Sequence, residues 1–337
     1  KHYAYLKISE GCNNRCTFCI IPKLRGDLVS RPVDEVLKEG ERLIKAGVKE
    51  VLVISQDTSA YGLDLAYAER PWKDRTIRTK FFDLARELGS LGAWVRLHYV
   101  YPYPHVDDVI PLMAEGLVLP YLDIPFQHVS PQVLKAMKRP GNQEKTLDRI
   151  RAWRDVCPDL AIRSTFIVGF PGESEADFQA TLDVVTELRF LAAYSFQYSK
   201  RPGTPAAQMS DQIAPEVISE RYTRLHHRLN EVSLSVNEDV VGKDVEVLLT
   251  DVDKGTGTGK SRDFRLVHCN LENATARPGD LVRTRITSAM PHFIFADSTP
   301  SEVIKTRGGD AFEARTKEAE SNGVMIGMPI LKSVPKK

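Results

Sequence analysis

Hydrophobic and polar positions follow two alternating periods up to about residue 205. Short apolar runs rich in β-branched and aromatic residues predict six strands, at residues 3–8, 51–55, 94–99, 121–125, 162–168 and 194–198. Between them, apolar residues recur at helical spacing and predict helices at residues 33–46, 80–88, 131–137, 145–156 and 175–188. This succession predicts an α/β domain whose parallel sheet curls into a full or partial (βα)6 TIM-like barrel with helices outside. In such folds the chemistry gathers at the C-terminal ends of the strands.

The pattern changes after about residue 205. Residues 215–240 predict one long charged helix with Arg221, Arg224 and Arg228 on one face, which we interpret as a solvated face. Residues 243–296 contain short alternating stretches separated by turn residues and predict a small antiparallel β-barrel. Within it, the segment KGTGTGK (254–260) does not open a helix and lacks phosphate-loop spacing, so we interpret it as a loop with glycine turns.

These patterns divide the chain into a core at residues 1–232, a β-barrel domain at residues 233–297 and a tail at residues 298–337. The tail is polar and contains glycine, with a late apolar patch, VMIGMPIL, at residues 324–331. Such a composition is compatible with disorder, and we leave the tail unassigned.

Composition narrows the class of protein without identifying it. The chain has 337 residues, of which 42% are hydrophobic and 27% charged, and its formal net charge is +1. This balance argues against a strongly basic nucleic-acid-binding protein, and no apolar run approaches the roughly 18–20 residues of a membrane span. The first residues, KHYAYLKISEGC, contain no apolar core of a secretory signal. Three of the cysteines lie too close together for a disulfide framework, so we expect a reducing, cytoplasmic setting and no membrane partner.

Those three cysteines, Cys12, Cys16 and Cys19, directly follow the first predicted strand. Thiolates at this spacing on a loop can converge on a soft metal centre. Structural zinc is the obvious alternative, but it takes four closed ligands, often as two C-x-x-C pairs. Neither Cys157 nor Cys269 belongs to such a pair. We therefore favour an iron–sulfur cluster with one iron left open, where a small molecule can bind.

The pattern C-x-x-x-C-x-aromatic-C at the end of the first strand of a βα barrel resembles the radical S-adenosylmethionine superfamily. The resemblance implies one 4Fe–4S cluster ligated by Cys12, Cys16 and Cys19, whose open iron binds the amino and carboxylate groups of S-adenosylmethionine. It implies that the sulfonium is cleaved reductively to a 5′-deoxyadenosyl radical, which abstracts a hydrogen atom from the substrate. It also places Phe18 against the adenine, and it implies no catalytic side chain beyond the cluster ligands.

Further motifs resemble one enzyme family of this superfamily, the methylthiotransferases, which convert C–H to C–S–CH3. The motifs are EGCNNRCTFC (10–19) with Pro22, Arg25, Gly26 and the SRP at 30–32, SQDT (55–58) after the second strand, Gln127 after the fourth, and FIVGFPGE (166–173) after the fifth. The likeness runs from residue 1 to about residue 297 and implies that the small β-barrel is of the TRAM type. It also places Gln127, Arg163 and Ser164 near S-adenosylmethionine. For Arg163, a salt bridge within the barrel is an equal alternative.

Two substrates compete within this family. Segments 55–61, 98–113 and 121–131 resemble the RimO-type branch, which methylthiolates the β-carbon of an aspartate in small-subunit ribosomal protein S-twelve. Segment 194–207 resembles the MiaB-type branch, which modifies isopentenyladenosine beside the tRNA anticodon. We favour the ribosomal protein, or the small ribosomal subunit, as the partner because the earlier segments supply most of the strand ends. The tRNA is the alternative, and a metal-stabilised RNA-binding module is the non-enzymatic one.

The aromatic segment HYVYPYPH (98–105) permits two interpretations of its own. Aromatic rings interleaved with histidine can stack on a nucleobase, whereas proline-rich aromatic loops more often pack the mouth of a barrel. His98, His105 and His128 show no metal-ligand spacing, so we expect hydrogen-bonding or surface roles for them.

The resemblance also implies components that this sequence does not contain. Members of the methylthiotransferase family carry a preceding domain whose three further cysteines hold a second cluster. This chain begins at the radical core, and we expect Cys157 and Cys269 to be small buried residues that cannot replace those ligands. We therefore expect the chain to cleave S-adenosylmethionine without completing methylthiolation. The reaction also implies an electron donor such as flavodoxin or ferredoxin.

Overall fold

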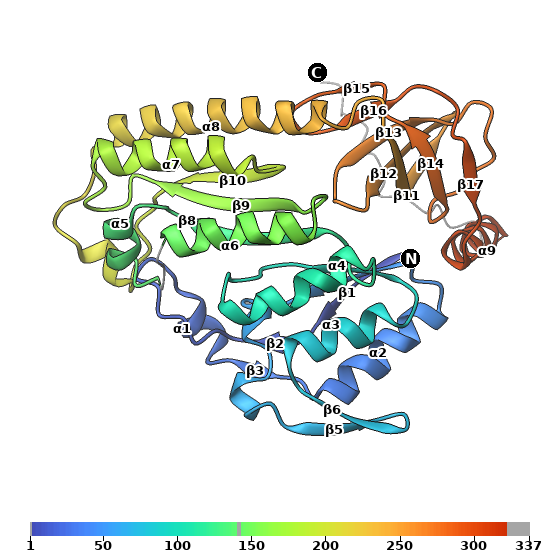
Figure 1. The fold of residues 1–337 in the computed structure, drawn as a ribbon, viewed down its shortest axis with the longest axis horizontal. Coiled ribbons are helices and arrows are strands. Elements are labelled where there is room, and N and C mark those ends of the chain that lie inside the picture. The colour runs from blue at the N-terminus through green and yellow to red at the C-terminus, as the bar shows by residue number, and fades with distance from the viewer. Residues whose placement is uncertain (1, 140–142, 322–337) are drawn as a thin grey trace, which may run out of the picture.

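A six-stranded parallel sheet forms the centre of the molecule in a computed structural model that describes residues 2–139 and 143–321 (Figure 1). Within this sheet each strand lies beside the one that precedes it along the chain, in the order β1-β4-β7-β8-β9-β10. The strands are β1 (Tyr3–Lys7), β4 (Glu50–Ile54), β7 (Trp94–Leu97), β8 (Tyr121–Gln127), β9 (Ala161–Val168) and β10 (Ala192–Gln197). All six predicted strands are confirmed, with ends that differ by at most two residues.

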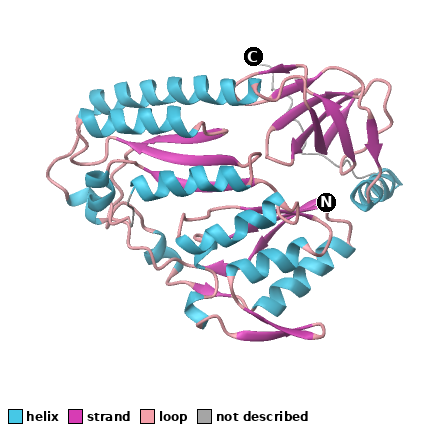
Figure 2. Ribbon diagram, in the orientation of Figure 1, coloured by secondary structure: helices cyan, strands magenta, loops and turns pink. Residues whose placement is uncertain are grey.

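Helices follow the strands, and most of them cover the outer face of the sheet, as Figure 2 shows. They are α2 (Val33–Lys45), α3 (Phe81–Gly89), α4 (Ile110–Ala114), α5 (Pro131–Ala136), α6 (Gln143–Val156), α7 (Glu175–Leu188) and α8 (Pro215–Glu238). The outermost strands, β1 and β10, are not paired with each other in the described chain, so the barrel is partial. No helix in the described ranges has the length and apolar character needed to cross a membrane.

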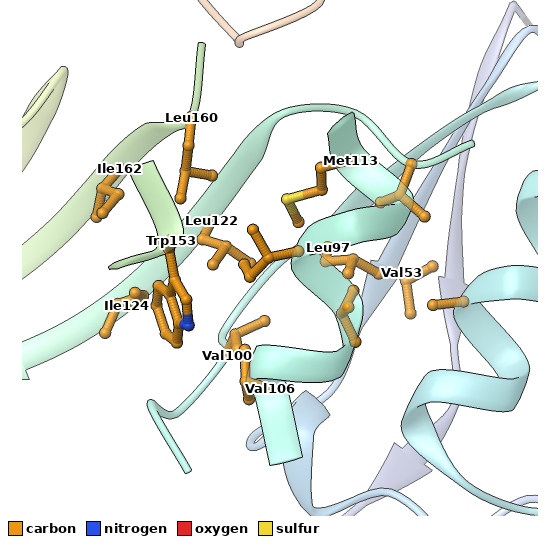
Figure 3. Packing of buried hydrophobic residues seen from close by; sticks show 14 of the residues in the cluster. Val53, Leu97, Val100, Val106, Met113, Leu122, Ile124, Trp153, Leu160 and Ile162 are labelled. Carbon is orange, nitrogen blue, oxygen red and sulfur yellow. The ribbon is translucent and has the colours of Figure 1, made fainter. Parts of the chain in front are cut away.

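The main hydrophobic core lies between the sheet and these helices (Figure 3). Leu97 of β7 pairs in register with Leu122 of β8, which pairs with Ile162 of β9. Met113 of α4 and Trp153 of α6 pack on these strand residues from the helical layer. Because strands of a parallel sheet are covered by helices, their side chains are apolar in near-continuous runs, which is the pattern that predicted them.

A second, mainly antiparallel sheet follows α8 and forms a separate unit that we call the β-domain (residues 244–304). Its strands are β11 (Asp244–Asp253), β12 (Thr256–Ser261), β13 (Leu266–Asn270), β14 (Leu281–Arg285), β15 (Ser288–Ala289), β16 (Ile294–Ala296) and β17 (Glu302–Ile304). The pairing of β13 with β16 is parallel, and the other pairings are antiparallel. Val247, Val267 and Val282 are buried in a core of its own. The expected small antiparallel β-unit is thus confirmed.

The segment KGTGTGK is mostly a strand, and its prediction as a loop was wrong. Only Lys254 and Gly255 form a turn, and the rest belongs to β12, which pairs with β11 and β13. A β-carbon at Gly257 would lie 2.5 Å from a methyl carbon of Leu271. A β-carbon at Gly259 would lie 2.3 Å from the carbonyl oxygen of Leu248. These glycines therefore allow close packing inside the small sheet and do not mark turns.

Part of the tail at residues 298–337, to which the sequence assigned no structure, forms a strand and a helix. Strand β17 pairs with β14, and α9 (Arg307–Ser321) follows it. Arg277 of the β-domain binds α9 through Asp310 at 2.9 Å and Glu313 at 2.8 Å. The second sheet therefore extends past residue 297, and α8 runs across the boundary expected between residues 232 and 233. The apolar patch at residues 324–331 lies outside the described residues.

Several short elements were missed in the sequence. They are the paired strands β2 (Ser9–Glu10) and β3 (Val29–Ser30), the hairpin β5 (Glu69–Trp72) and β6 (Arg75–Arg78), and the helices α1 (Ile21–Arg25) and α4 (Ile110–Ala114). Each is too short for a hydrophobic period to be visible. Two of them, β2 and α1, flank the cysteine loop, so the surroundings of the loop could not be read from periodicity.

Arg96 of β7 joins the barrel to the β-domain from a fully buried position. Its Nε atom donates to Oε1 of Glu50 in β4 at 2.5 Å. Its other two nitrogens donate to the carbonyl oxygens of Arg262 at 2.9 Å and Ser261 at 3.2 Å, both in the β-domain. The ring centre of Phe264 lies 4.5 Å from the guanidinium carbon. The buried cation is therefore compensated by groups of both units and fixes the β-domain at the N-terminal ends of the strands.

We expect Arg96→Ala to lower the free energy of unfolding by about 3–5 kcal/mol, because it leaves Glu50 buried without a counter-charge. Urea denaturation measures this change. The control is Arg285→Ala, which removes an exposed ion pair with Asp244 within the β-domain and should shift the midpoint little. Equal shifts for the two variants would contradict the role given to Arg96.

Candidate metal centre

The three cysteines lie on a loop that leaves β2 and enters α1. Strand β2 pairs with β3, and the amide of Cys12 donates to the carbonyl oxygen of Gly26 at 3.2 Å, directly after α1. Within the loop, the amide of Cys19 donates to the carbonyl oxygen of Cys16 at 3.0 Å. The loop is therefore closed on itself at the C-terminal end of the first barrel strand, where the sequence predicted the chemistry.

Gly11 starts this loop in a conformation that suits glycine alone. Its φ is +74°, and a β-carbon would lie 2.0 Å from the carbonyl oxygen of Asp27. Backbone atoms cannot move away as a flexible side chain could. The close approach of the two chain segments on either side of the cysteines therefore depends on the missing side chain.

Thr17 fixes the middle of the loop to distant parts of the chain. Its amide donates to the carbonyl oxygen of Met137 at 3.0 Å, and its hydroxyl donates to that of Ala136 at 2.9 Å. The carbonyl oxygen of Thr17 accepts a hydrogen bond from the amide of Ala206 at 3.0 Å. The C-terminal end of α5 and the segment after β10 thus hold the loop between Cys16 and Cys19.

The buried carboxylate of Asp57 holds the other side of the loop. Oδ2 accepts from the side-chain amide of Asn14 at 3.0 Å and from the hydroxyl of Tyr103 at 3.3 Å. Oδ1 accepts from the hydroxyl of Ser59 at 2.7 Å and from the amide of Ala60 at 3.2 Å. The segments after β4 and β7 therefore converge on a residue inside the cysteine motif.

Two of the thiols, those of Cys12 and Cys16, lie in a setting that favours their neutral form without a metal. Burial raises the pKa of Cys12, and the neighbouring Asp57 and the other two thiols raise it further. Burial also raises the pKa of Cys16, although Nη1 of Arg139 lies 3.7 Å from its Sγ and opposes this effect. A bound cation would therefore be required to keep these two thiols deprotonated at neutral pH.

A cavity of about 400 Å³ lies beside Cys16 and Cys19. Its lining includes three cationic side chains, those of Arg15, Lys23 and Lys138. Positive charge around thiolates and inorganic sulfide lowers the free energy of an anionic cluster. The donor set and the charge of this cavity therefore fit an iron–sulfur group.

Zinc and an iron–sulfur cluster place different demands on the spacing of these thiolates. In the described part of the chain, no three or more His, Cys, Asp or Glu side chains lie together as the ligands of one metal ion would. A zinc ion requires its ligands at a common centre, about 2.3 Å away for sulfur. In an iron–sulfur cluster each thiolate binds a different iron, so the sulfur atoms are held farther apart.

The structure places Phe18 and Gln127 on the same side of the barrel as the cysteines. Phe18 is half-buried and packs edge-to-face on Phe170, with 6.4 Å between ring centres. Gln127 is the last residue of β8, is half-buried and has a φ of +67°. Both residues remain candidates for the cofactor contacts that the family likeness implied.

Arg163 and Ser164 are already engaged within the barrel. Arg163 makes a two-point ion pair with Asp123, Nε to Oδ1 at 3.2 Å and Nη2 to Oδ2 at 2.6 Å, which is the salt-bridge alternative stated for it. The hydroxyl of Ser164 donates to the carbonyl oxygen of Ile124 at 2.9 Å, beside the register shift between β8 and β9. The ladder is irregular there because Pro125 has no amide hydrogen. The Ser164 hydroxyl thus binds a carbonyl oxygen of β8 at the point where the regular backbone ladder between β8 and β9 is interrupted.

Glu173, which closes the motif FIVGFPGE, is buried at the centre of a charged network. Oε2 accepts from the amide of Gly169 at 2.9 Å and lies 3.3 Å from Nε2 of His128. Oε1 accepts from Nη1 of Arg221 at 2.8 Å. Because Nδ1 of His128 accepts from the amide of Ser130 at 3.0 Å, a neutral His128 carries its proton on Nε2, facing Glu173. The network joins the segments after β8 and β9 to helix α8.

The arginine stripe of α8 therefore is only partly a solvated face: the expectation was wrong for Arg221 and holds for Arg228, which is exposed and pairs with Glu231 of the same helix. Arg221 is only 5% exposed and is held by Glu173 and Glu175. Arg224 pairs with Glu175 at 2.7 Å. The stripe meets the acidic start of α7, a tertiary contact that the charge pattern of α8 could not reveal.

The aromatic segment 98–105 packs against itself and against the cysteine loop. The rings of Tyr101 and Tyr103 lie 4.7 Å apart, and Tyr103 stacks on His105 at 5.6 Å. The guanidinium of Arg139, the residue beside Cys16, lies 4.7 Å from the ring centre of Tyr101. Nε2 of His105 lies 2.7 Å from the carbonyl oxygen of Ser59. Packing of the barrel mouth, one of the two interpretations, is what the structure shows.

Three further residues considered as candidates, Cys157, Cys269 and His98, lie away from the cysteine loop. Cys157 is buried in the main core and Cys269 in the core of the β-domain, as expected of small buried residues. Burial raises the pKa of Cys269 to about 12. Nδ1 of His98 lies 3.6 Å from Oδ2 of Asp123, and burial lowers the pKa of His98.

One family model covers the cysteine loop and strands β4 to β9 of the barrel. The model of the radical SAM superfamily matches residues 6–185. The chain belongs to the radical SAM superfamily.

Two relatives within the superfamily carry the same name, ribosomal protein uS12 methylthiotransferase RimO. The protein from Methylorubrum populi is 58% identical over 293 residues, which are 86% of this chain and 65% of the relative. The protein from Rhodopseudomonas palustris is 62% identical over 293 residues, 86% of this chain and 66% of the relative. The chain thus spans about two thirds of the length of these radical SAM relatives. Among solved structures, the radical S-adenosylmethionine methyltransferase TsrM from Kitasatospora setae matches 61% of this chain and 36% of its own, with a TM-score of 0.49 and 17% identity.

We expect Gly11→Ala to prevent assembly of the metal centre, because a β-carbon there collides with the backbone at Asp27. Iron bound per chain after anaerobic reconstitution measures this effect. Gly26→Ala is the matched control, since Gly26 also has a positive φ, +77°, but its β-carbon would meet nothing within 4 Å. If both variants bound iron equally well, the loop would not depend on the contact at Gly11.

We expect Glu173→Ala to lower the free energy of unfolding by about 3–5 kcal/mol, because Arg221 would remain buried without its main counter-charge. Glu175→Ala, two residues away, removes the exposed partner of the same arginine and should cost less than about 1 kcal/mol. Denaturant titration of both variants tests the difference. Similar losses of unfolding free energy for the two variants would mean that burial does not increase the contribution of the Glu173–Arg221 pair to stability.

Proposed function

We propose that this chain is the radical core of a methylthiotransferase that converts C–H to C–S–CH3 on the β-carbon of an aspartate in ribosomal protein uS12. The observation that carries the proposal is the loop of Cys12, Cys16 and Cys19, held from three sides at the mouth of the barrel. The relatives named for this activity support the choice of reaction, and they match the chain over 86% of its length.

In this proposal Cys12, Cys16 and Cys19 hold a 4Fe–4S cluster. When bound there, the cluster would supply one electron for the reductive cleavage of S-adenosylmethionine, which is the source of the hydrogen-abstracting radical in this proposal. Asp57 and Thr17 hold the loop in one conformation, which positions its ligands in advance. Phe18, packed on Phe170, provides an apolar surface beside the ligands for the adenine and excludes water from it.

The cofactor contacts of the proposal include Phe18 and Gln127 but not Arg163 and Ser164. The polar atoms of Arg163 are committed to Asp123, and the hydroxyl of Ser164 to the backbone of β8. Gln127 lies at the C-terminal end of β8 with its side chain half-buried, where a polar group of the cofactor could accept or donate a hydrogen bond.

The ribosomal protein is favoured over tRNA as the substrate for two reasons. The alignments to the uS12-modifying relatives cover 293 residues at 58% and 62% identity. Two of the three arginines of the α8 stripe, Arg221 and Arg224, are paired with Glu173 and Glu175 and so are not free to bind a phosphate backbone. The segment 194–207, which resembles the tRNA-modifying branch, is the observation that keeps tRNA as the second candidate. We further propose a small electron-transfer protein as the donor and the cytoplasm as the site of action.

The radical step is tested by anaerobic reconstitution with iron and sulfide, followed by reduction in the presence of S-adenosylmethionine. We expect about four irons per chain and formation of 5′-deoxyadenosine. Cys16→Ala should abolish both, whereas Cys157→Ala, the same change in the main core, should preserve both. One zinc per chain without cleavage of S-adenosylmethionine, or full activity of Cys16→Ala, would exclude the proposed chemistry.

The substrate is tested by mass spectrometry of uS12 and of tRNA from cells that lack the gene for this protein. We expect the methylthio group to be missing from the aspartate of uS12 and to return when the complete gene is restored. Loss of the modification from tRNA, with uS12 unchanged, would instead establish the second candidate.

A further inference from the structure

A second cavity, of about 380 Å³, lies at the opposite end of the barrel from the cysteine loop. Three parts of the chain line it: the first residues of β10, one side of α8 and the β-domain. Tyr121 at the start of β8 and Arg163 near the start of β9 also line it. Its volume is in the range of pockets that bind small molecules, about 300–1,000 Å³. The cavity has no part in the proposed radical step.

The lining of this cavity is cationic. It contains Arg163, Lys260 and Arg265, and none of its lining residues is Asp or Glu. Arg163 is paired with Asp123, and Arg265 with Asp263, so both are fixed by partners that are not part of the lining. Burial lowers the pKa of Lys260, and the positive charges of Arg96 and Arg163 lower it further. An anion in the cavity would offset these repulsions.

Aromatic rings lie beside two of these charges, Arg163 and Lys260. The guanidinium of Arg163 lies 5.3 Å from the ring centre of Tyr194, and Nζ of Lys260 lies 4.9 Å from that of Phe264. On α8, Tyr222 stacks on His226 with ring centres 6.0 Å apart. Tyr194 is 54% exposed although it belongs to a strand, so its ring is available for contact. The cavity thus offers flat apolar surfaces and positive charge together.

The cavity is also built to keep its shape. Phe264, which lies between the barrel and the β-domain, has a φ of +77°, a conformation that bulky residues rarely adopt. Arg265 follows it, and its guanidinium donates to Oδ1 of Asn237 and to the carbonyl oxygen of Val236, both at 3.0 Å. The arginine of the β-domain is thereby fastened to the end of α8. Strain of this kind persists where the surrounding contacts enforce it, and it is often found at ligand sites.

We propose that this cavity binds a nucleotide, with its phosphate at Lys260 and its base against Tyr194. A nucleotide combines an anionic phosphate with a flat aromatic base. Bases of every kind can stack on aromatic side chains. Lysine binds phosphate as a point charge, whereas the two arginines, each paired with an aspartate outside the lining, are rigid parts of the wall of the cavity. The nucleotide can come from the free pool or from a single-stranded RNA, and the two sources share this chemistry.

Isothermal titration of the whole chain with adenosine 5′-monophosphate tests the proposal. We expect adenosine and inorganic phosphate each to bind at least about tenfold more weakly than the nucleotide, since each supplies only half of the contacts. Saturating S-adenosylmethionine should leave the affinity for the nucleotide unchanged, because the two sites lie at opposite ends of the barrel. Competition between them would overturn the assignment of this cavity.

Two variants and one control locate the binding. Lys260→Gln should weaken nucleotide binding about tenfold. Lys254→Gln, the same change in the exposed turn before β12, should have no effect. Tyr194→Ala should weaken binding of the nucleotide and of adenosine, and should leave binding of phosphate unchanged. Lys260→Gln should also cleave S-adenosylmethionine at the normal rate after reconstitution, which separates this proposal from the radical chemistry.

A short single-stranded oligoribonucleotide distinguishes the two sources. Binding at least about tenfold tighter than the mononucleotide, and equally sensitive to Lys260→Gln, assigns RNA. Binding no tighter than the mononucleotide assigns the free pool. The proposal is overturned if neither ligand binds, if Lys260→Gln binds as the unaltered chain does, or if an acidic peptide binds while nucleotides do not.

Discussion

A single buried carboxylate, that of Glu173, holds together the parts of the chain that surround the mouth of the barrel. It is bound by the amide of Gly169, by Arg221 of α8 and by its contact with His128. A buried charge is tolerated only when its partners are all in place, so the segments after β8 and β9 cannot move independently of α8. Arg221, which might have faced a ligand, is used for this purpose.

The cysteine loop depends on that constraint through packing. Glu173 fixes the turn that contains Phe170, and Phe170 packs on Phe18 inside the cysteine motif. On the other side, Thr17 is bonded to the end of α5, and Asn14 to Asp57. A short loop without regular structure thus acquires one conformation from its neighbours. This is the preorganisation that a metal centre requires if its ligands are to be in place before the metal binds.

The two ends of the barrel serve different purposes, and α8 spans both. Near its start, Arg221 closes the network at the cysteine end. At its other end, Asn237 holds Arg265 beside the cationic cavity. The buried Arg96, bonded to Glu50 and to carbonyl oxygens of the β-domain, makes the barrel and the β-domain one structure at that end. The cavity exists only because these units are fixed against each other.

The sequence alone determined what depends on neighbours along the chain. The six strands and their helices follow from hydrophobic period, and Cys12, Cys16 and Cys19 could be recognised from their spacing. Only the tertiary structure decided which charges meet. Arg221 looked solvated and is buried, Arg163 could have bound a cofactor and is paired with Asp123, and the glycines of β12 looked like turn residues and allow close packing. The physical reason is that an ion pair or a close approach joins residues far apart in sequence, and a local pattern carries no information about the distant partner.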